Sequence, residues 1–176
     1  SVLLSIFNII TNTPFPFIPI QITLIDLAIE GYTSFFLSFK QNDKPIEGSF
    51  LKTVFKNASP YALTIILCLV VLTFMRAGLN ISEDMMLTIE YLTIGGVSVF
   101  AVIESCRPFN RLSTFLCTTT ALGYFMATYL FQGFLHLTPL DSDGLAVLVC
   151  TLFVAYIVVV GLKLIIDNVI KEMKKI

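Results

Sequence analysis

Five runs of about 20 predominantly apolar residues constrain the fold of this chain more than any other feature. They cover residues 17–38, 59–78, 87–106, 112–132 and 145–166. A helix rises about 1.5 Å per residue, so each run matches the ~30 Å hydrocarbon core of a bilayer. The composition agrees, because 56% of the 176 residues are hydrophobic and only 13% are charged, about half the charged share of a soluble domain. The sequence predicts an all-α membrane protein and excludes an ordinary water-soluble fold.

The N-terminal segment is apolar but short. Residues 1–13 would cover only about 18 Å as a helix, and three prolines between residues 13 and 19 end any helix there. The chain also begins at Ser1, without an initiator Met or a basic leader. We therefore expect a six-helix transmembrane bundle whose first helix is truncated, with residues 1–176 forming one membrane unit of a longer protein.

The basic residues predict the orientation of these spans. Ten of the 11 Lys and Arg residues fall in the loop 39–58, the turn 106–111 and the segment after residue 162, whereas Arg76 stands with the acidic loops around residues 83 and 141. By the positive-inside rule the first group is cytoplasmic, which places both termini inside the cell. The net charge of −1 provides no basic field that could hold nucleic acid, so nucleic-acid binding is excluded.

Soft-metal chemistry and hydrolysis are not favoured by the residues of this chain. Cys68, Cys106, Cys117 and Cys150 form no CxxC pair, and His136 has no second histidine. The cysteines are therefore interpreted as small buried hydrophobic residues. The sequence also lacks a nucleophile–base pair and a phosphate-binding glycine loop, so no catalytic residue and no bound cofactor is expected within this chain.

Two carboxylates near the middle of the span 17–38 are the strongest candidates for a cation site. Asp26 and Glu30 are spaced i and i+4, which puts them on one helical face. The hydroxyl residues Thr23, Thr33 and Ser34 are expected on the same face. Gly31 marks a place where the helix could open and release backbone carbonyls, the ligands that hard cations prefer. The alternative is a pair of protonated acids that hydrogen-bond to a neighbouring helix.

Three further polar residues within the apolar segments have roles that the sequence alone does not decide. Asn8 belongs to a stripe with Ser1, Ser5 and Asn12 that either completes a cation shell or joins helices by hydrogen bonds. Glu104 is either a ligand or the partner of Arg107 near the cytoplasmic end of its span. Glu90 is closer to the outer surface, where an interfacial role is expected.

Residues 18–31 carry a resemblance to a known family. The stretch Ile-Pro-Ile-Gln-Ile-Thr-Leu-Ile-Asp-Leu-Ala-Ile-Glu-Gly resembles the sixth transmembrane helix of P-type cation-transporting ATPases, whose calcium pumps read approximately Ile-Pro-x-Gln-Leu-Leu-x-x-Asn-Leu-x-Thr-Asp-Gly. On this match Asp26 stands in place of an ion-binding Asn and Glu30 in place of an ion-binding Asp. Ile29 replaces a Thr, which removes one hydroxyl near the site.

Two other segments extend the resemblance along the chain. The loop 39–60 resembles the corresponding loop of a bacterial branch of these pumps that is linked to calcium export, and residues 103–106 resemble the part of the eighth helix where calcium pumps carry a ligand Glu, here Glu104. The resemblance implies that the chain is the fifth to tenth membrane helices of the pump.

The implied function is ATP-driven export of a divalent cation, calcium, across the bacterial plasma membrane. The metal ligands would come from Asp26, Glu30, Glu104, Asn8 and Thr23. Mg-ATP binding and phosphorylation would belong to upstream parts of the same pump, so the chain would be part of an enzyme without containing its catalytic motifs. Its partners would be the lipid bilayer, those upstream parts and the transported cation.

Two other function classes remain open from the residues alone. A secondary transporter or channel could use the carboxylate pair with a proton or sodium gradient, without any ATPase domain. A membrane scaffold that transports nothing would tolerate the loss of both acids.

Overall fold

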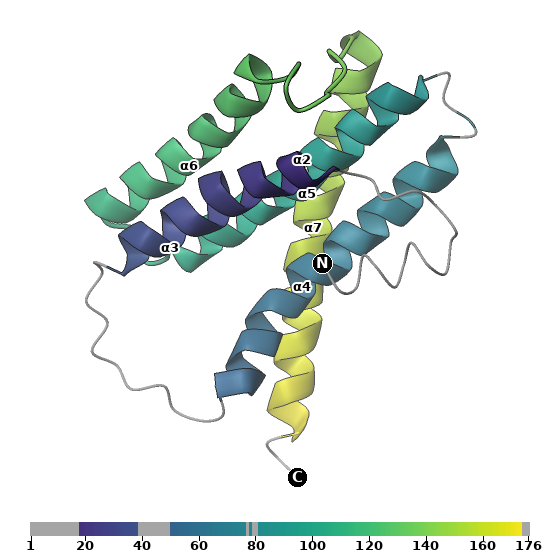
Figure 1. Cartoon of the computed structure of the whole chain (residues 1–176). Coiled ribbons are helices and arrows are strands. Elements are labelled where there is room, and N and C mark those ends of the chain that lie inside the picture. Colours follow the sequence, from purple (N-terminus) through teal and green to yellow (C-terminus); the bar gives the residue numbers. More distant parts are fainter. Residues whose placement is uncertain (1–17, 39–49, 77, 79–80, 174–176) are drawn as a thin grey trace.

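The computed structural model describes residues 18–38, 50–76, 78 and 81–173 (Figure 1). The expected first half-helix with Asn8, the proline-rich turn before Ile18 and most of the loop 39–58 lie outside these residues. Every regular element in the described ranges is helical: α2 (Pro19–Ile25), the π-helical segment η1 (Asp26–Gly31), α3 (Tyr32–Leu37), α4 (Phe50–Met75), α5 (Glu83–Ser105), α6 (Arg111–Leu130) and α7 (Ser142–Met173). The all-α prediction is confirmed for this part of the chain.

Three of these helices are long and apolar enough to cross a membrane. The qualifying segments are Thr53–Met75, Glu83–Ser105 and Ser142–Ile170. The runs at 17–38 and 112–132 also form helices, but the first is divided by η1 and the second contains a less apolar 20-residue helix. The total of six membrane helices stays a prediction.

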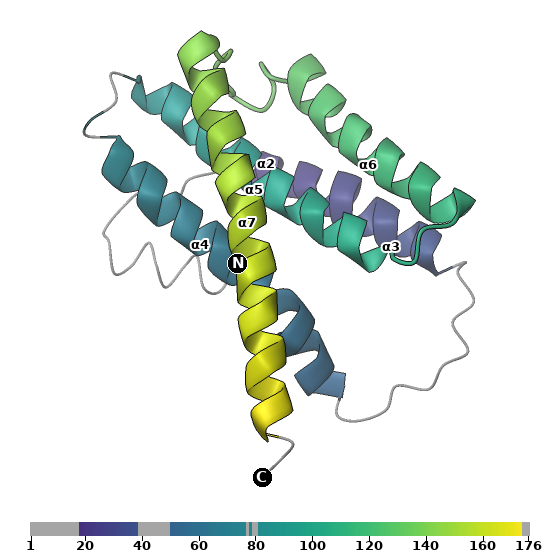
Figure 2. The same cartoon turned by 180° about the vertical axis from the view of Figure 1, so that it is seen from behind.

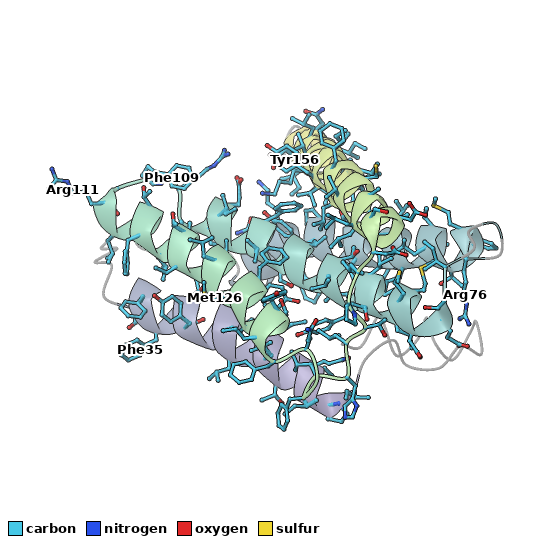
Figure 3. All side chains as sticks on the ribbon, turned by 90° about the horizontal axis from the view of Figure 1, so that it is seen from above. Phe35, Arg76, Phe109, Arg111, Met126 and Tyr156 are labelled. Carbon is cyan, nitrogen blue, oxygen red and sulfur yellow. The ribbon has the colours of Figure 1, made fainter. Side chains whose placement is uncertain are left out.

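The described helices alternate in direction. In Figure 1 the ends near residues 38, 50, 105 and 173 lie toward the lower left or bottom of the molecule, and the ends near residues 18, 75, 83 and 142 lie toward the upper right. Figure 3 shows Arg76 and Arg111 at opposite ends of the structure. This arrangement agrees with the charge separation in the sequence, whereas the assignment of one end to the cytoplasm stays a prediction.

Helix α5 forms the centre of the packing. It contacts α4, α6, α7 and η1, and α7 crosses both α4 and α5 in the view from behind (Figure 2). Gly95 and Gly96 make this close approach possible, because a Cβ on Gly95 would overlap the Tyr124 ring of α6 and a Cβ on Gly96 would overlap Leu152 of α7. Small residues at helix contacts are typical of membrane bundles.

Side-chain caps fix where the helices begin. The Ser82 hydroxyl accepts a hydrogen bond from the backbone N–H of Met85 at 3.3 Å, and the Asn110 side chain accepts one from Ser113 at 2.7 Å. Asp141 does the same for the N–H of Gly144 at 2.7 Å. These side chains satisfy N–H groups that a helix leaves unpaired in its first turn.

Helices α4 and α7 extend well beyond the apolar runs that predicted them. Helix α4 begins at Phe50, nine residues before the expected start at 59, and α7 continues to Met173, seven residues past 166. An apolar run identifies only the part of a helix that lies in the hydrocarbon core. The helix itself can continue into the polar interface until the sequence no longer favours it. Pro60 does not end α4, although it has no N–H to donate to the Lys56 carbonyl.

Candidate cation site

The polypeptide between Pro19 and Leu37 is one helical segment with a change of hydrogen bonding in its middle. Over Asp26–Gly31 the backbone is π-helical, and the N–H of Tyr32 bonds to the carbonyl of Leu27, five residues earlier. Gly31 suits this geometry because it has no side chain. A Cβ at this position would lie only 3.2 Å from the Asp26 carbonyl oxygen, which is a tight contact. The sequence predicted that the helix opens at Gly31. The structure shows a wider turn at this point instead of a break, a feature that is frequent at functional sites.

Both predicted carboxylates lie on the exposed face of this segment. Asp26 and Glu30 are exposed, while Ile25 and Ile29 are 8% and 1% exposed and face the core. No ion pair or hydrogen bond reaches either carboxylate from the residues that the structure describes. Thr23 is exposed as well, and its hydroxyl donates to the Pro19 carbonyl at 3.0 Å. The structure therefore brings Asp26, Glu30 and Thr23 to one exposed side of the helix.

Thr33 does not belong to this exposed stripe, contrary to the expectation from the sequence. It is 5% exposed, and its hydroxyl lies 3.4 Å from that of Thr120 on α6. Ser34 remains exposed. A π-helical turn takes one residue more than an α-helical turn, so the residues that follow it are rotated relative to a regular α-helix. The α-helical spacing used for the prediction therefore fails after Gly31.

Hydrogen bonds to α5, α6 and the turn after α6 hold the segment in place. The Gln21 side chain, 7% exposed, donates to the carbonyl of Leu135 at 2.8 Å and accepts from the N–H of Ile18 at 3.0 Å. The Tyr91 hydroxyl donates to the Gln21 carbonyl at 3.3 Å. The hydroxyl oxygens of Tyr32 and Thr119 are hydrogen-bonded to each other at 2.9 Å. Sequence reasoning missed Gln21 as an anchor, although an amide in an apolar run signals an internal partner.

Glu104 lies in a different environment from the two carboxylates of η1. It is 3.3 Å from the Lys163 ammonium and 3.5 Å from the Arg107 guanidinium. In the described part of the chain, no three His, Cys, Asp or Glu side chains form a group that could hold a metal ion. The structure thus shows the ion pair with Arg107 that the sequence left open, and the ligand role of Glu104 stays a prediction.

The burial of Glu90 inside the helix bundle was not predicted from the sequence. Glu90 on α5 is only 9% exposed, whereas its position in the sequence indicated the membrane interface. Thr88 and Ile89 beside it are also buried. The central position of α5, which is a tertiary feature, buries nearly every residue between 86 and 97, so a spacing argument on one helix could not identify Glu90.

Comparison with known proteins gives one informative similarity. The chain is 36% identical, over 136 residues, to the probable cation-transporting ATPase exp7 of Streptococcus pneumoniae serotype 4. This chain is similar to part of a cation-transporting ATPase. The aligned region covers 76% of this chain but only 17% of the length of that relative. No protein-family model matches the chain, and no solved structure gives a significant match.

Proposed function

We propose that this chain forms the C-terminal membrane part of a P-type pump that exports a divalent cation, calcium, across a bacterial plasma membrane. The similarity to a probable cation-transporting ATPase supports ATP-driven transport of a cation. The resemblance of residues 18–31 to the sixth helix of calcium pumps supports the choice of ion. ATP would be hydrolysed by parts of the pump that lie outside this chain.

The pair of exposed carboxylates on η1 is the observation that carries this proposal. Asp26 and Glu30 lie within a predominantly apolar span and have no charged partner among the described residues. A carboxylate that faces lipid costs about 2.5 kcal/mol or more, so intramembrane acids mark ion pathways by default. The exposed face of η1 is therefore best explained as one wall of a cation site that other helices of the pump complete.

The proposed mechanism is alternating access. A hard cation takes six to eight oxygen ligands, which Asp26 and Glu30 can supply in part, with backbone carbonyls and water completing the shell. Phosphorylation in the upstream parts would tilt the helices and change the spacing of Asp26, Glu30 and Glu104. A tight inward-facing site would become a weak outward-facing one. The free carboxylates would then carry protons on the return step.

Cation-stimulated ATPase activity of the full-length protein tests this function. We expect micromolar calcium to stimulate ATP hydrolysis by the wild-type protein and Glu30→Gln to abolish the stimulation. Glu83→Gln is the matched control, because Glu83 lies at the end of α5 and pairs with Arg76 at 2.7 Å, outside the proposed site. An unchanged calcium activation curve in Glu30→Gln would remove Glu30 from the site.

Transport measurements separate this proposal from the gradient-driven alternative. Inside-out vesicles that contain the full-length protein should accumulate calcium only when ATP is present. Accumulation that follows an imposed proton or sodium gradient without ATP would instead show a secondary transporter. If Asp26→Asn combined with Glu30→Gln left transport unchanged, a pump that uses this carboxylate pair would be excluded.

A further inference from the structure

Two adjoining cavities lie between α4, α5 and α7, near the ends of α4 and α5 at residues 50 and 105. Their volumes are about 340 and 300 Å³, and they share Tyr61, Glu104 and Lys163 as walls. We call the two cavities together the α4–α7 cleft. The proposed cation-transport mechanism does not use this cleft apart from Glu104, so its remaining groups need another explanation.

The two halves of the α4–α7 cleft differ in chemistry. The larger cavity is lined by polar groups that include Lys56, Asn57 and Asp167. The smaller one continues along the side chains of Phe100, Val160 and Tyr156, and the rings of Phe100 and Tyr156 pack edge to face with their centres 5.7 Å apart. A site with a charged head next to an open apolar channel fits an amphiphile better than a soluble ion.

The described charged side chains of the cleft have one positive charge in excess. Lys56 pairs with Asp167 at 2.6 Å. Lys163 and Arg107 both approach the single carboxylate of Glu104, at 3.3 and 3.5 Å. Among the residues that the structure describes, three cations therefore face two carboxylates, and the excess equals the charge of one phosphodiester group. Lys163 also lies 4.9 Å from the ring centre of Tyr61, which keeps its ammonium at the wall shared by both cavities.

Tyr61 adds an unused polar group at the same wall. Its hydroxyl oxygen is buried and has no hydrogen-bond partner in the described part of the structure. A buried hydroxyl without a partner is destabilising, because it has lost its hydrogen bonds to water and gained none in the protein. An ester or phosphate oxygen held beneath Lys163 would give this hydroxyl an acceptor.

The depth of the cleft matches the level of lipid phosphates. From Ser142 at the start of α7 to Lys163 the helix rises about 32 Å. The hydrocarbon core is about 30 Å thick. If α7 enters the hydrocarbon near Ser142, Lys163 lies at the opposite interface, and the apolar channel along Phe100 and Val160 lies on the hydrocarbon side of it.

We propose that the α4–α7 cleft binds one anionic phospholipid with an uncharged headgroup, phosphatidylglycerol. The phosphodiester lies beside Lys163 and Arg107, the glycerol hydroxyls reach the polar residues near Lys56, and one acyl chain follows Phe100 and Val160. A zwitterionic lipid is disfavoured because its ammonium group would meet carboxylates that already have cationic partners. This inference requires a membrane location but does not depend on ATP-driven transport.

Native mass spectrometry of the full-length protein tests the proposal. The protein is reconstituted in phosphatidylcholine nanodiscs that contain phosphatidylglycerol, released into detergent and analysed for retained lipid. We expect one retained phosphatidylglycerol in the wild type and at least about tenfold less in Lys163→Gln, which removes the excess charge. Arg76→Gln is the matched control, because it removes an ion-paired cation at the opposite end of the structure.

A second variant tests the apolar half without changing any charge. Val160→Trp fills the channel beside Phe100 and should lower phosphatidylglycerol retention, while Leu122→Trp on the exposed side of α6 should not. Equal retention of phosphatidylcholine and phosphatidylglycerol, or unchanged retention in Lys163→Gln, would overturn the proposal. Displacement of the lipid by millimolar inorganic phosphate would also overturn it and indicate a site for a soluble anion.

Discussion

Replacement of Gln21 by Met removes the hydrogen bonds that anchor the helical segment containing η1 and leaves the carboxylates of η1 unchanged. The Gln21 side chain makes two hydrogen bonds, to the Leu135 carbonyl and from the Ile18 N–H, while only 7% exposed. Methionine has a similar length and volume but makes neither bond. The Leu135 carbonyl then loses a buried partner, which costs about 1–3 kcal/mol. Taking about 2 kcal/mol, the population in which this part of the bundle is open rises about 30-fold.

Labelling of a buried cysteine measures this opening. Cys117 on α6 is 9% exposed, and α6 leads directly into the turn that Gln21 binds. A maleimide reacts with Cys117 only when the helix moves away, so its labelling rate follows the open population when reclosing is fast. In the full-length protein, peptide mass spectrometry should show labelling about 30-fold faster in Gln21→Met.

A matched variant decides whether the effect belongs to the buried hydrogen bonds. Thr23→Val removes a hydroxyl from the same helix, but this hydroxyl is exposed and bonds only within the helix. Its labelling rate should stay within about threefold of the wild type. A change of less than twofold in Gln21→Met, or an equal increase in Thr23→Val, would refute the anchoring role of Gln21.

Three other substitutions have graded expected effects in the same labelling assay. Gly95→Ala forces a Cβ into a buried tyrosine ring of α6 and should destabilise the packing by about 1–3 kcal/mol. Gly123→Ala is the control and should have little effect, because its Cβ meets nothing within 4 Å in the described structure. Equal effects of the two substitutions would refute the packing argument. Tyr32→Phe removes a part-buried hydrogen bond to α6 and should cost about 1 kcal/mol, and no change would show that this bond contributes nothing. Lys56→Gln breaks its bridge to Asp167 but should cost less than about 1 kcal/mol, because both side chains are more than a third exposed and water screens them. A larger loss would show that this ion pair is worth more than its exposure implies.

Local sequence signals predicted the helices well because the signals and the helices have the same physical cause. Apolar runs of about 20 residues produce helices in which the backbone satisfies its own hydrogen bonds, and all five described runs are helical. The cap residues Ser82, Asn110 and Asp141 lie where these runs begin, so the loop positions were also predictable. The ends of α4 and α7 were not, since hydropathy does not report where a helix stops outside the hydrocarbon.

The roles of particular polar residues were predicted less well. The spacing of Asp26 and Glu30 correctly put them on one face, because four residues nearly complete one turn. The same spacing argument failed for Thr33, because it assumes a regular α-helix. The π-helical hydrogen bonds before Thr33 change the number of residues per turn, and a regular α-helical period does not predict this change. The Glu104 ion pairs include Arg107, three residues away, which a helical spacing reveals, but also Lys163, 59 residues away, which it does not.

The sequence by itself therefore determined the helical class of the described chain, the approximate place of each apolar helix and the separation of basic and acidic ends. These properties depend on the solvent that each segment prefers and on neighbours within one turn. Only the tertiary structure decided that α5 is central, that Glu90 and Gln21 are buried and that Lys163 meets Glu104 beside the α4–α7 cleft. Such facts depend on which helices lie side by side, and no periodicity within a single helix specifies its neighbours.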